Sequence, residues 1–213
     1  MKTDDLVAML ASGAGAVDAR APRRRLVLAL LGGASVASLW MATWLGVNPA
    51  LGGYVQVPMF WVREAFCGAM AAGGLLAAYR LARPGVALAG VRWALAVPVV
   101  ALWMLAAAVL LATEAGSRLD LVRGVSWTEC SVNIAALALP VFVAMAWWMK
   151  GLAPTRLRLA GAAAGLAAGA VGALVYTLHC PELAAPFLGI WYVLGMFLPA
   201  AAGALLGPFL LSW

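Results

Sequence analysis

The sequence predicts an all-α, polytopic membrane protein: a bundle of six transmembrane helices preceded by a short amphipathic helix at the N-terminus. Apolar residues make up 66% of the 213 residues and charged residues only 10%. Soluble domains carry roughly a quarter of charged residues, and a water-soluble core of this size cannot bury so many apolar side chains. A bilayer span needs about 20 predominantly apolar residues, and six such stretches follow one another along the chain.

The six stretches divide the chain into a head, residues 1–25, and a transmembrane domain, residues 26–213. The predicted spans are Leu26–Leu45, Pro58–Leu81, Trp93–Thr113, Trp127–Met149, Leu157–Leu178 and Phe187 to about Leu211. Tryptophans mark several ends of these spans, as expected for interface anchors. Pro98 and Pro140 lie inside the third and fourth spans and are expected to kink them.

The second and fifth spans each carry an unusual feature. Arg63 and Glu64 enter the second span, where ionisable groups are costly, and we expect Arg63 to pair with Glu129 or Glu182. In the fifth span, small residues recur every four positions on one face, and small residues let helices approach closely in lipid. They are Gly161, Gly165 and Gly169, and the sixth span adds Gly203 and Gly207. These faces predict either packing within the chain or the interface of a homo-oligomer.

The distribution of lysines and arginines predicts the orientation in the membrane. Eleven of them lie in the head or in the second and fourth connections, against two, Arg118 and Arg123, in the remaining connections. Because basic residues favour the cytoplasmic side, we expect both termini in the cytoplasm. Orientation and anionic lipid explain the net charge of +6 without a nucleic-acid partner.

The tetrapeptide His179–Cys180–Pro181–Glu182 ends the fifth span and contains the only histidine of the chain. Cys130 lies near the start of the fourth span, and the predicted topology puts both cysteines on the outer side. Thiols bind soft metals and are redox groups. Three interpretations remain open: a metal or redox sensor, a permanent disulfide, and unpaired thiols.

In the sensor interpretation, Cys130 and Cys180 are the sensing residues. His179, Glu182 and Glu129 are then possible auxiliary ligands of a transient thiophilic metal ion, and no resident cofactor is required. Cys67, flanked by Phe66 and Gly68 in the second span, is expected to be an apolar filler.

Enzymatic function is poorly supported, because the sequence has no deep pair of carboxylates, no catalytic triad and no CxxC motif. A small-molecule or metal transporter is an alternative, but it would need acidic residues near the midplane of the membrane, which are absent. A membrane thiol oxidoreductase that uses Cys130 and Cys180 is the other alternative.

The head predicts a short helix that starts at Thr3–Asp4–Asp5 and ends at Ser12–Gly13. Thr3 can cap the helix, and the two acids suit its positive end. Its apolar stripe consists of Leu6, Val7, Met9 and Leu10. Such a helix docks on a membrane or in the groove of a partner, and its acidic end favours a basic protein.

The start Met1-Lys2-Thr3-Asp4-Asp5-Leu6, the six spans and Leu178-His179-Cys180-Pro181-Glu182 followed by Trp191-Tyr192 resemble the NrsF-type anti-sigma factors. The resemblance covers essentially the whole chain. It implies a protein of the bacterial inner membrane that holds an extracytoplasmic-function sigma factor inactive. It also implies sigma binding by Asp4, Asp5, Leu6 and Leu10, and a response to heavy-metal or oxidative stress through Cys130 and Cys180.

Overall fold

The all-α prediction is confirmed. The computed structural model describes residues 3–12, 18 and 20–212, and every regular element within them is helical. The helices are α1 (Thr3–Ser12), α2 (Ala21–Trp44), α3 (Leu51–Tyr54), α4 (Pro58–Leu81), α5 (Val91–Ala112), α6 (Arg118–Arg123), α7 (Trp127–Lys150), α8 (Leu157–Tyr176), α9 (Ala185–Phe187) and α10 (Val193–Leu210). A 3₁₀ turn, Ala115–Ser117, precedes α6, and one turn of π-helix, Leu188–Tyr192, joins α9 to α10.

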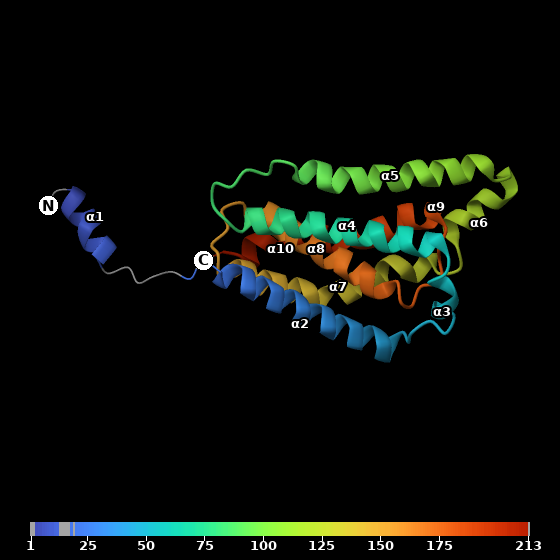
Figure 1. Cartoon of the computed structure of the whole chain (residues 1–213), viewed down its shortest axis with the longest axis horizontal. Helices are drawn as coiled ribbons and strands as arrows, with labels where there is room; N and C mark the ends of the chain where they lie inside the picture. The colour runs from blue at the N-terminus through green and yellow to red at the C-terminus, as the bar shows by residue number, and fades with distance from the viewer. Residues whose placement is uncertain (1–2, 13–17, 19, 213) are drawn as a thin grey trace.

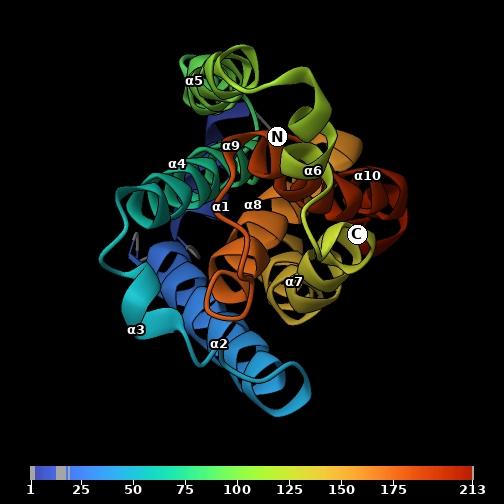
Figure 2. The same ribbon diagram turned by 90° about the vertical axis from the view of Figure 1, so that its right-hand side faces the viewer.

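The bundle is built around α8. Helices α2, α4, α7 and α10 all pack against it, and Figure 2 shows them around α8 in a view along the bundle. In the most apolar 18-residue stretch of α8, 78% of the residues are buried inside the protein, against 11% in the corresponding stretch of α5. Helix α5 packs on α4 and α9 at the edge of the bundle (Figure 1). A helix buried on all sides needs small residues all round, and α8 consists mostly of alanine and glycine.

The glycines of α8 bring it into backbone contact with α10. A Cβ atom at Gly165 would overlap the carbonyl oxygen of Pro199, and one at Gly161 would overlap that of Gly203. A Cβ atom at Gly169 would lie 2.7 Å from the carbonyl oxygen of Met196. The predicted packing role of the glycine face is therefore confirmed, and this face is occupied within the chain.

The helix boundaries match the predicted spans closely, apart from the start of α2. This helix begins at Ala21, with Pro22 in its first turn. Proline is favoured there because the first N–H groups of a helix have no intrahelical acceptor, so the N–H that proline lacks costs no hydrogen bond. Arg23, Arg24 and Arg25, assigned above to the head, therefore lie on the first turns of α2. Pro98 and Pro140 lie inside α5 and α7, as predicted.

The predicted number of six apolar spans is corrected to five, although α4 runs the length of the bundle beside the other long helices (Figure 1). Within the described residues, five helical stretches are long and apolar enough to cross a membrane, and α4 is not among them. Helix α4 has the bounds predicted for the second span and 24 residues. Arg63, Glu64 and Arg80 lower its hydropathy. Neighbouring helices bury much of α4, so that protein rather than lipid surrounds the Arg63 side chain.

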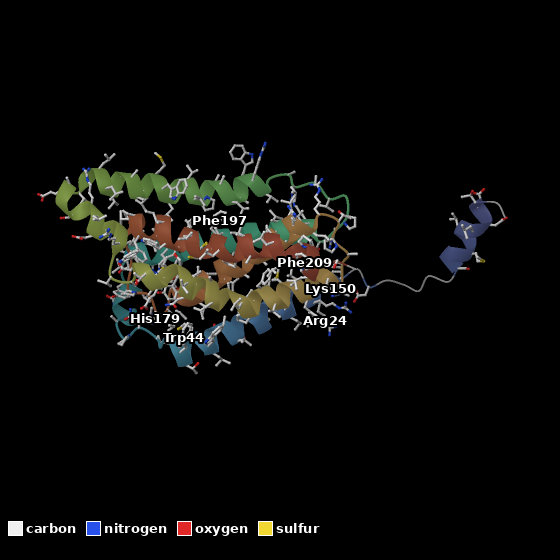
Figure 3. The ribbon with its side chains drawn as sticks, turned by 180° about the vertical axis from the view of Figure 1, so that it is seen from behind. Arg24, Trp44, Lys150, His179, Phe197 and Phe209 are labelled. Carbon is white, nitrogen blue, oxygen red and sulfur yellow. The ribbon has the colours of Figure 1, made fainter. Side chains whose placement is uncertain are left out.

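The two ends of the bundle differ in chemistry. Figure 3 places Arg24 and Lys150 at one end, the basic end, where α2 begins and α7 ends. It places Trp44 and His179 at the opposite end, the thiol end, which also holds the start of α7 and the residues after α8. Helix α1 lies apart from the bundle, beyond the basic end (Figure 1).

The contact between α8 and α10 generates a test of the fold. Gly165→Ala is expected to destabilise the protein by about 1–3 kcal/mol, as overpacking does, because the new methyl group meets main-chain atoms that cannot rotate away. The measurement is thermal unfolding in detergent micelles. The control is Gly32→Ala in α2, where a Cβ atom meets nothing within 4 Å. Equal stability of the two variants would contradict the described contact.

Candidate functional site

The structure brings Cys130 and Cys180 together at the thiol end. Cys130 lies in the first turn of α7, where its N–H donates to the carbonyl of Ser126 (3.0 Å). Cys180 lies just after α8, with its N–H on the carbonyl of Tyr176 (3.0 Å). Helices α7 and α8 pack against each other in opposite directions, so the start of one meets the end of the other. Both cysteines are completely buried, and both thiols are free.

The two thiols interact directly and are not equivalent. A side-chain hydrogen bond from Cys130 lowers the pKa of the Cys180 thiol to about 6, although burial opposes this shift. The positive charge of Arg63 lowers the pKa further. The Ser126 hydroxyl lies 4.0 Å from the Cys180 sulfur. Cys180 is therefore the more acidic member of the pair, and thiolates are the reactive form of cysteine.

Arg63 of α4 holds the segment that carries Cys180. Its Nη1 donates to the carbonyl oxygens of Cys180 and Glu182, both at 3.0 Å, and its Nη2 donates to that of Thr177 at 2.9 Å. The side chain is completely buried. Thr177 caps the C-terminal end of α8, where carbonyl groups lack helical partners and attract positive charge. One guanidinium therefore closes the end of α8 and fixes the chain on both sides of Cys180.

The expected partner of Arg63 is corrected. Its ion pair within the described residues is with the adjacent Glu64, at 3.7 Å from Nε to Oε1, rather than with the carboxylates of Glu129 or Glu182. Glu182 contacts Arg63 through its main-chain oxygen. A main-chain oxygen is available at every residue, so residue types alone do not reveal it as a partner.

His179 and Glu182 tie the Cys180 segment to two further loops. The Nδ1 atom of His179 lies 2.9 Å from the carbonyl oxygen of Gly46, after α2. The carboxylate of Glu182 accepts a hydrogen bond from the N–H of Val125 (2.7 Å), before α7. Gly124 must be a glycine here, because its φ is +57° and a Cβ atom would lie 2.5 Å from this carboxylate. The tetrapeptide therefore connects the end of α8 to the residues after α2 and to those before α7.

The predicted auxiliary ligands do not join the thiols in one cluster. Within the described residues, no group of three or more His, Cys, Asp or Glu side chains is arranged to hold a metal ion. Glu129 is exposed in the first turn of α7. Cys67 is completely buried in α4, as expected for an apolar filler. The site that the structure supports is a buried dithiol.

Helix α1 is the second candidate site. Asp4, Asp5 and Leu6 are all exposed, and Val7 and Met9 are 60% and 61% exposed. Leu10 lies within α1, but its side chain falls outside the described part of the chain. The predicted helix is confirmed, and the apolar side chains described on it are uncovered.

Comparison with known proteins identifies related chains. The sequence model of a family described as "NrsF: Negative regulator of sigma F" matches residues 10–213. The chain is 52% identical over 213 residues to the "Probable anti-sigma-F factor NrsF" of Azospira oryzae. It is 39% identical over 216 residues to the "Anti-sigma-F factor NrsF" of Caulobacter vibrioides. Both alignments cover all of each chain. No solved structure matches.

The Arg63 contacts generate a test of the site. Arg63→Met leaves the carbonyls of Thr177, Cys180 and Glu182 without this donor, and each unsatisfied buried acceptor costs roughly 1–3 kcal/mol. The Cys180 segment should then open more often. We expect N-ethylmaleimide to alkylate the Cys180 thiolate at least about tenfold faster, since 1.4 kcal/mol corresponds to a factor of ten. Because Arg63 also lowers the pKa of this thiol, the rates are compared per thiolate, from the pH dependence of alkylation in each variant. Peptide mass spectrometry measures the rate.

The control for this test is Arg118→Met at the same end. Arg118 is exposed and donates through Nε to the carbonyl of Thr113 (3.0 Å). Alkylation of Cys180 should be unchanged in this variant. If Arg63→Met alkylated no faster than the unmodified chain, Arg63 would not hold the segment.

Proposed function

The chain belongs to the NrsF family of negative regulators of sigma F, and we propose that it is a membrane-bound anti-sigma factor that binds its sigma factor through α1. Both curated relatives are named anti-sigma-F factors, and each aligns with this chain over its full length. The observation that carries the proposal is α1 itself. It is a helix with exposed apolar side chains and two acids in its first turn, and it lies apart from the bundle.

The binding mode follows from the chemistry of α1. An amphipathic helix of 10 residues is marginal alone in water, but it becomes stable when its apolar face enters a groove. Leu6 and Leu10 would fill that groove, and Asp4 and Asp5 would face basic residues of the partner. A sigma factor of the extracytoplasmic-function class, bound in this way, is kept from core RNA polymerase.

The proposed orientation puts α1 where a sigma factor is found. The basic end carries the arginines at the start of α2, after α4 and before α8, and basic residues favour the cytoplasmic side of the inner membrane. The thiol end then faces the periplasm, an oxidising compartment. This arrangement separates a signal-receiving end from a partner-binding end.

The proposed signal is oxidation of the dithiol or its capture by a thiophilic metal. A two-electron oxidant takes one electron pair from the two thiols, an S–S bond forms between Cys130 and Cys180, and both protons leave. A soft metal ion instead displaces the two protons and bridges the sulfurs. The low pKa of Cys180 supports either step, because its thiolate is the group that first attacks the oxidant or coordinates the metal ion.

The proposed route to α1 uses α7 and α2. Cys130 lies at one end of α7, and Trp148 at the other end donates its Nε1–H to the carbonyl of Pro22 (2.8 Å) in the first turn of α2. The far end of α2 leads to Gly46, which contacts His179. The dithiol is thus connected to both ends of α2, the helix that follows α1. If oxidation or metal binding at the dithiol favours one arrangement of α7, the hydrogen bond from Trp148 to Pro22 favours the matching position of the start of α2.

Binding by α1 is tested with Leu6→Ser in the full-length chain. Burying a leucine contributes about 1.5–3 kcal/mol, so we expect the affinity for the cognate sigma factor to fall about tenfold to hundredfold. The measurement is titration of the detergent-solubilised protein with labelled sigma factor. Leu119→Ser is the matched control, because Leu119 is 52% exposed at the thiol end. Equal affinities of the two variants would refute binding by the apolar face of α1.

Sensing is tested by Cys130→Ser and Cys180→Ser. Each is expected to abolish the rise in sigma-dependent transcription after cadmium or dichromate, because one sulfur can neither form the disulfide nor bridge a metal. A transcriptional reporter measures the response. Cys67→Ala is the control and should respond normally. A full response in either serine variant would remove the sensor function and leave the anti-sigma function intact.

A further inference from the structure

A basic cavity of about 350 Å³ lies at the basic end of the bundle. It is formed by the end of α4, the connection from α4 to α5 and the residues before α8. Its lining includes Arg80, Leu81, Arg83, Leu88, Thr155 and Arg156. The cavity collects three guanidinium groups, from the last turn of α4, the connection after it and the residue before α8, which is about 70 residues further along the chain. None of these groups takes part in the sites described above.

The arginines of this cavity retain hydrogen-bond donors. Arg80 uses Nη1 to hold the carbonyls of Ala87 and Ala89. Arg83 lies over the ring of Tyr79, 4.2 Å from its centroid, and donates to the Tyr79 hydroxyl through Nη2. Each guanidinium has five N–H donors. Among residues 20–212, no carboxylate lies within ion-pair distance of Arg80, Arg83 or Arg156. The cavity therefore offers positive charge that no protein anion in this part of the chain neutralises.

An apolar groove of about 480 Å³ continues from the basic cavity. Leu81 and Leu88 line both of them. The groove runs between α5 on one side and α8 and α10 on the other, and Phe197, labelled in Figure 3, lines it at the far end. Along α8 it extends from Leu159 to Leu166, which is about 10 Å at 1.5 Å per residue.

Small residues create this groove. Alanines of α8 and α10 face α5 where larger side chains would otherwise fill the space; they include Ala162, Ala163, Ala201 and Ala204. Helix α5 packs on α4 and α9 instead. Trp93 at the start of α5 is 61% exposed and Trp147 near the end of α7 is 68% exposed. Exposed tryptophans mark the headgroup level of a membrane, so the basic cavity lies at that level and the groove lies below it.

We propose that this composite site binds one anionic phospholipid. The phosphate accepts hydrogen bonds from Arg83 and Arg156, and an acyl chain occupies the groove between α5 and α8. Arginine is well suited to phosphate because its fork donates two bonds at once. A free anion would use only the cavity, and a neutral hydrocarbon would use only the groove. A molecule with a phosphate and a hydrocarbon chain uses both, and basic pockets at the cytoplasmic side are known to bind such headgroups.

The headgroup part is tested with the full-length protein in detergent micelles. Phosphatidylglycerol is titrated, and native mass spectrometry counts the bound lipid. We expect one retained phosphatidylglycerol at concentrations where phosphatidylcholine is not retained. Arg83→Gln with Arg156→Gln should weaken binding at least about tenfold, the change that 1.4 kcal/mol produces. Both arginines are exposed and lie in connections, so the fold should persist, which thermal unfolding checks.

The control for charge is Arg24→Gln with Arg158→Gln. These two arginines are exposed at the same end of the bundle but line neither the cavity nor the groove. This variant should bind phosphatidylglycerol as the unmodified chain does. An equal loss in both double variants would overturn the site in favour of general surface attraction. Unchanged binding in Arg83→Gln with Arg156→Gln would also overturn it.

The acyl part is tested with two neighbouring alanines of α10. Ala201 lines the groove, whereas Ala202 lines a different groove on the other side of the helix, and both are exposed. Ala201→Phe fills the groove and should displace the lipid, while Ala202→Phe should not. Inorganic phosphate, titrated alone, should not compete at the concentration of lipid that saturates the site. Competition by phosphate together with full binding in Ala201→Phe would show a free-anion site and overturn the proposal.

Discussion

The Arg63 guanidinium joins three parts of the chain that are distant in sequence. It comes from α4, it caps the end of α8 at Thr177, and it binds the carbonyls of Cys180 and Glu182. A positive charge buried without partners would be prohibitively costly in a membrane protein. The neighbouring carboxylate of Glu64, the negative end of α8 and three carbonyl oxygens compensate it. The position of Cys180 beside Cys130, and with it the dithiol, depends on this arrangement.

The bundle combines a rigid centre with a loosely attached edge. Helix α8 meets α10 through main-chain contacts at Gly161 and Gly165, where even a methyl group does not fit. Helix α5 leaves an apolar groove at the same depth, because alanines face it. Close packing transmits displacement, since packed elements have few alternative arrangements. A chemical change at the thiol end therefore acts on helices α7 and α8, which pack against each other, more directly than on α5.

The fold class, most helix boundaries and the close packing of the glycine face of α8 are predictable, because apolar length and the spacing of small residues are local properties of the sequence. That α10 rather than another chain covers this face is not, because the spacing of glycines does not identify their partner. The sequence also indicated that Cys130 and Cys180 lie at one end, since a short connection makes α7 and α8 antiparallel neighbours. The partners of Arg63 were not predictable, because they are main-chain oxygens. The exclusion of α4 from the apolar spans follows from Arg63, Glu64 and Arg80, three charged residues that the sequence itself displays.

The long separation between Arg63 and its acceptors has a consequence for biosynthesis. Its hydrogen-bond partners lie 114 to 119 residues further along the chain. At 5–20 residues per second, roughly 6–24 s pass between the synthesis of the donor and that of its acceptors. During that interval α4 carries a cation that nothing in α8 yet compensates. The hydrogen bonds of Arg63 therefore cannot form until α8 and the residues up to Glu182 have been synthesised. The buried arrangement of Arg63 is thus completed only after most of the chain has left the ribosome.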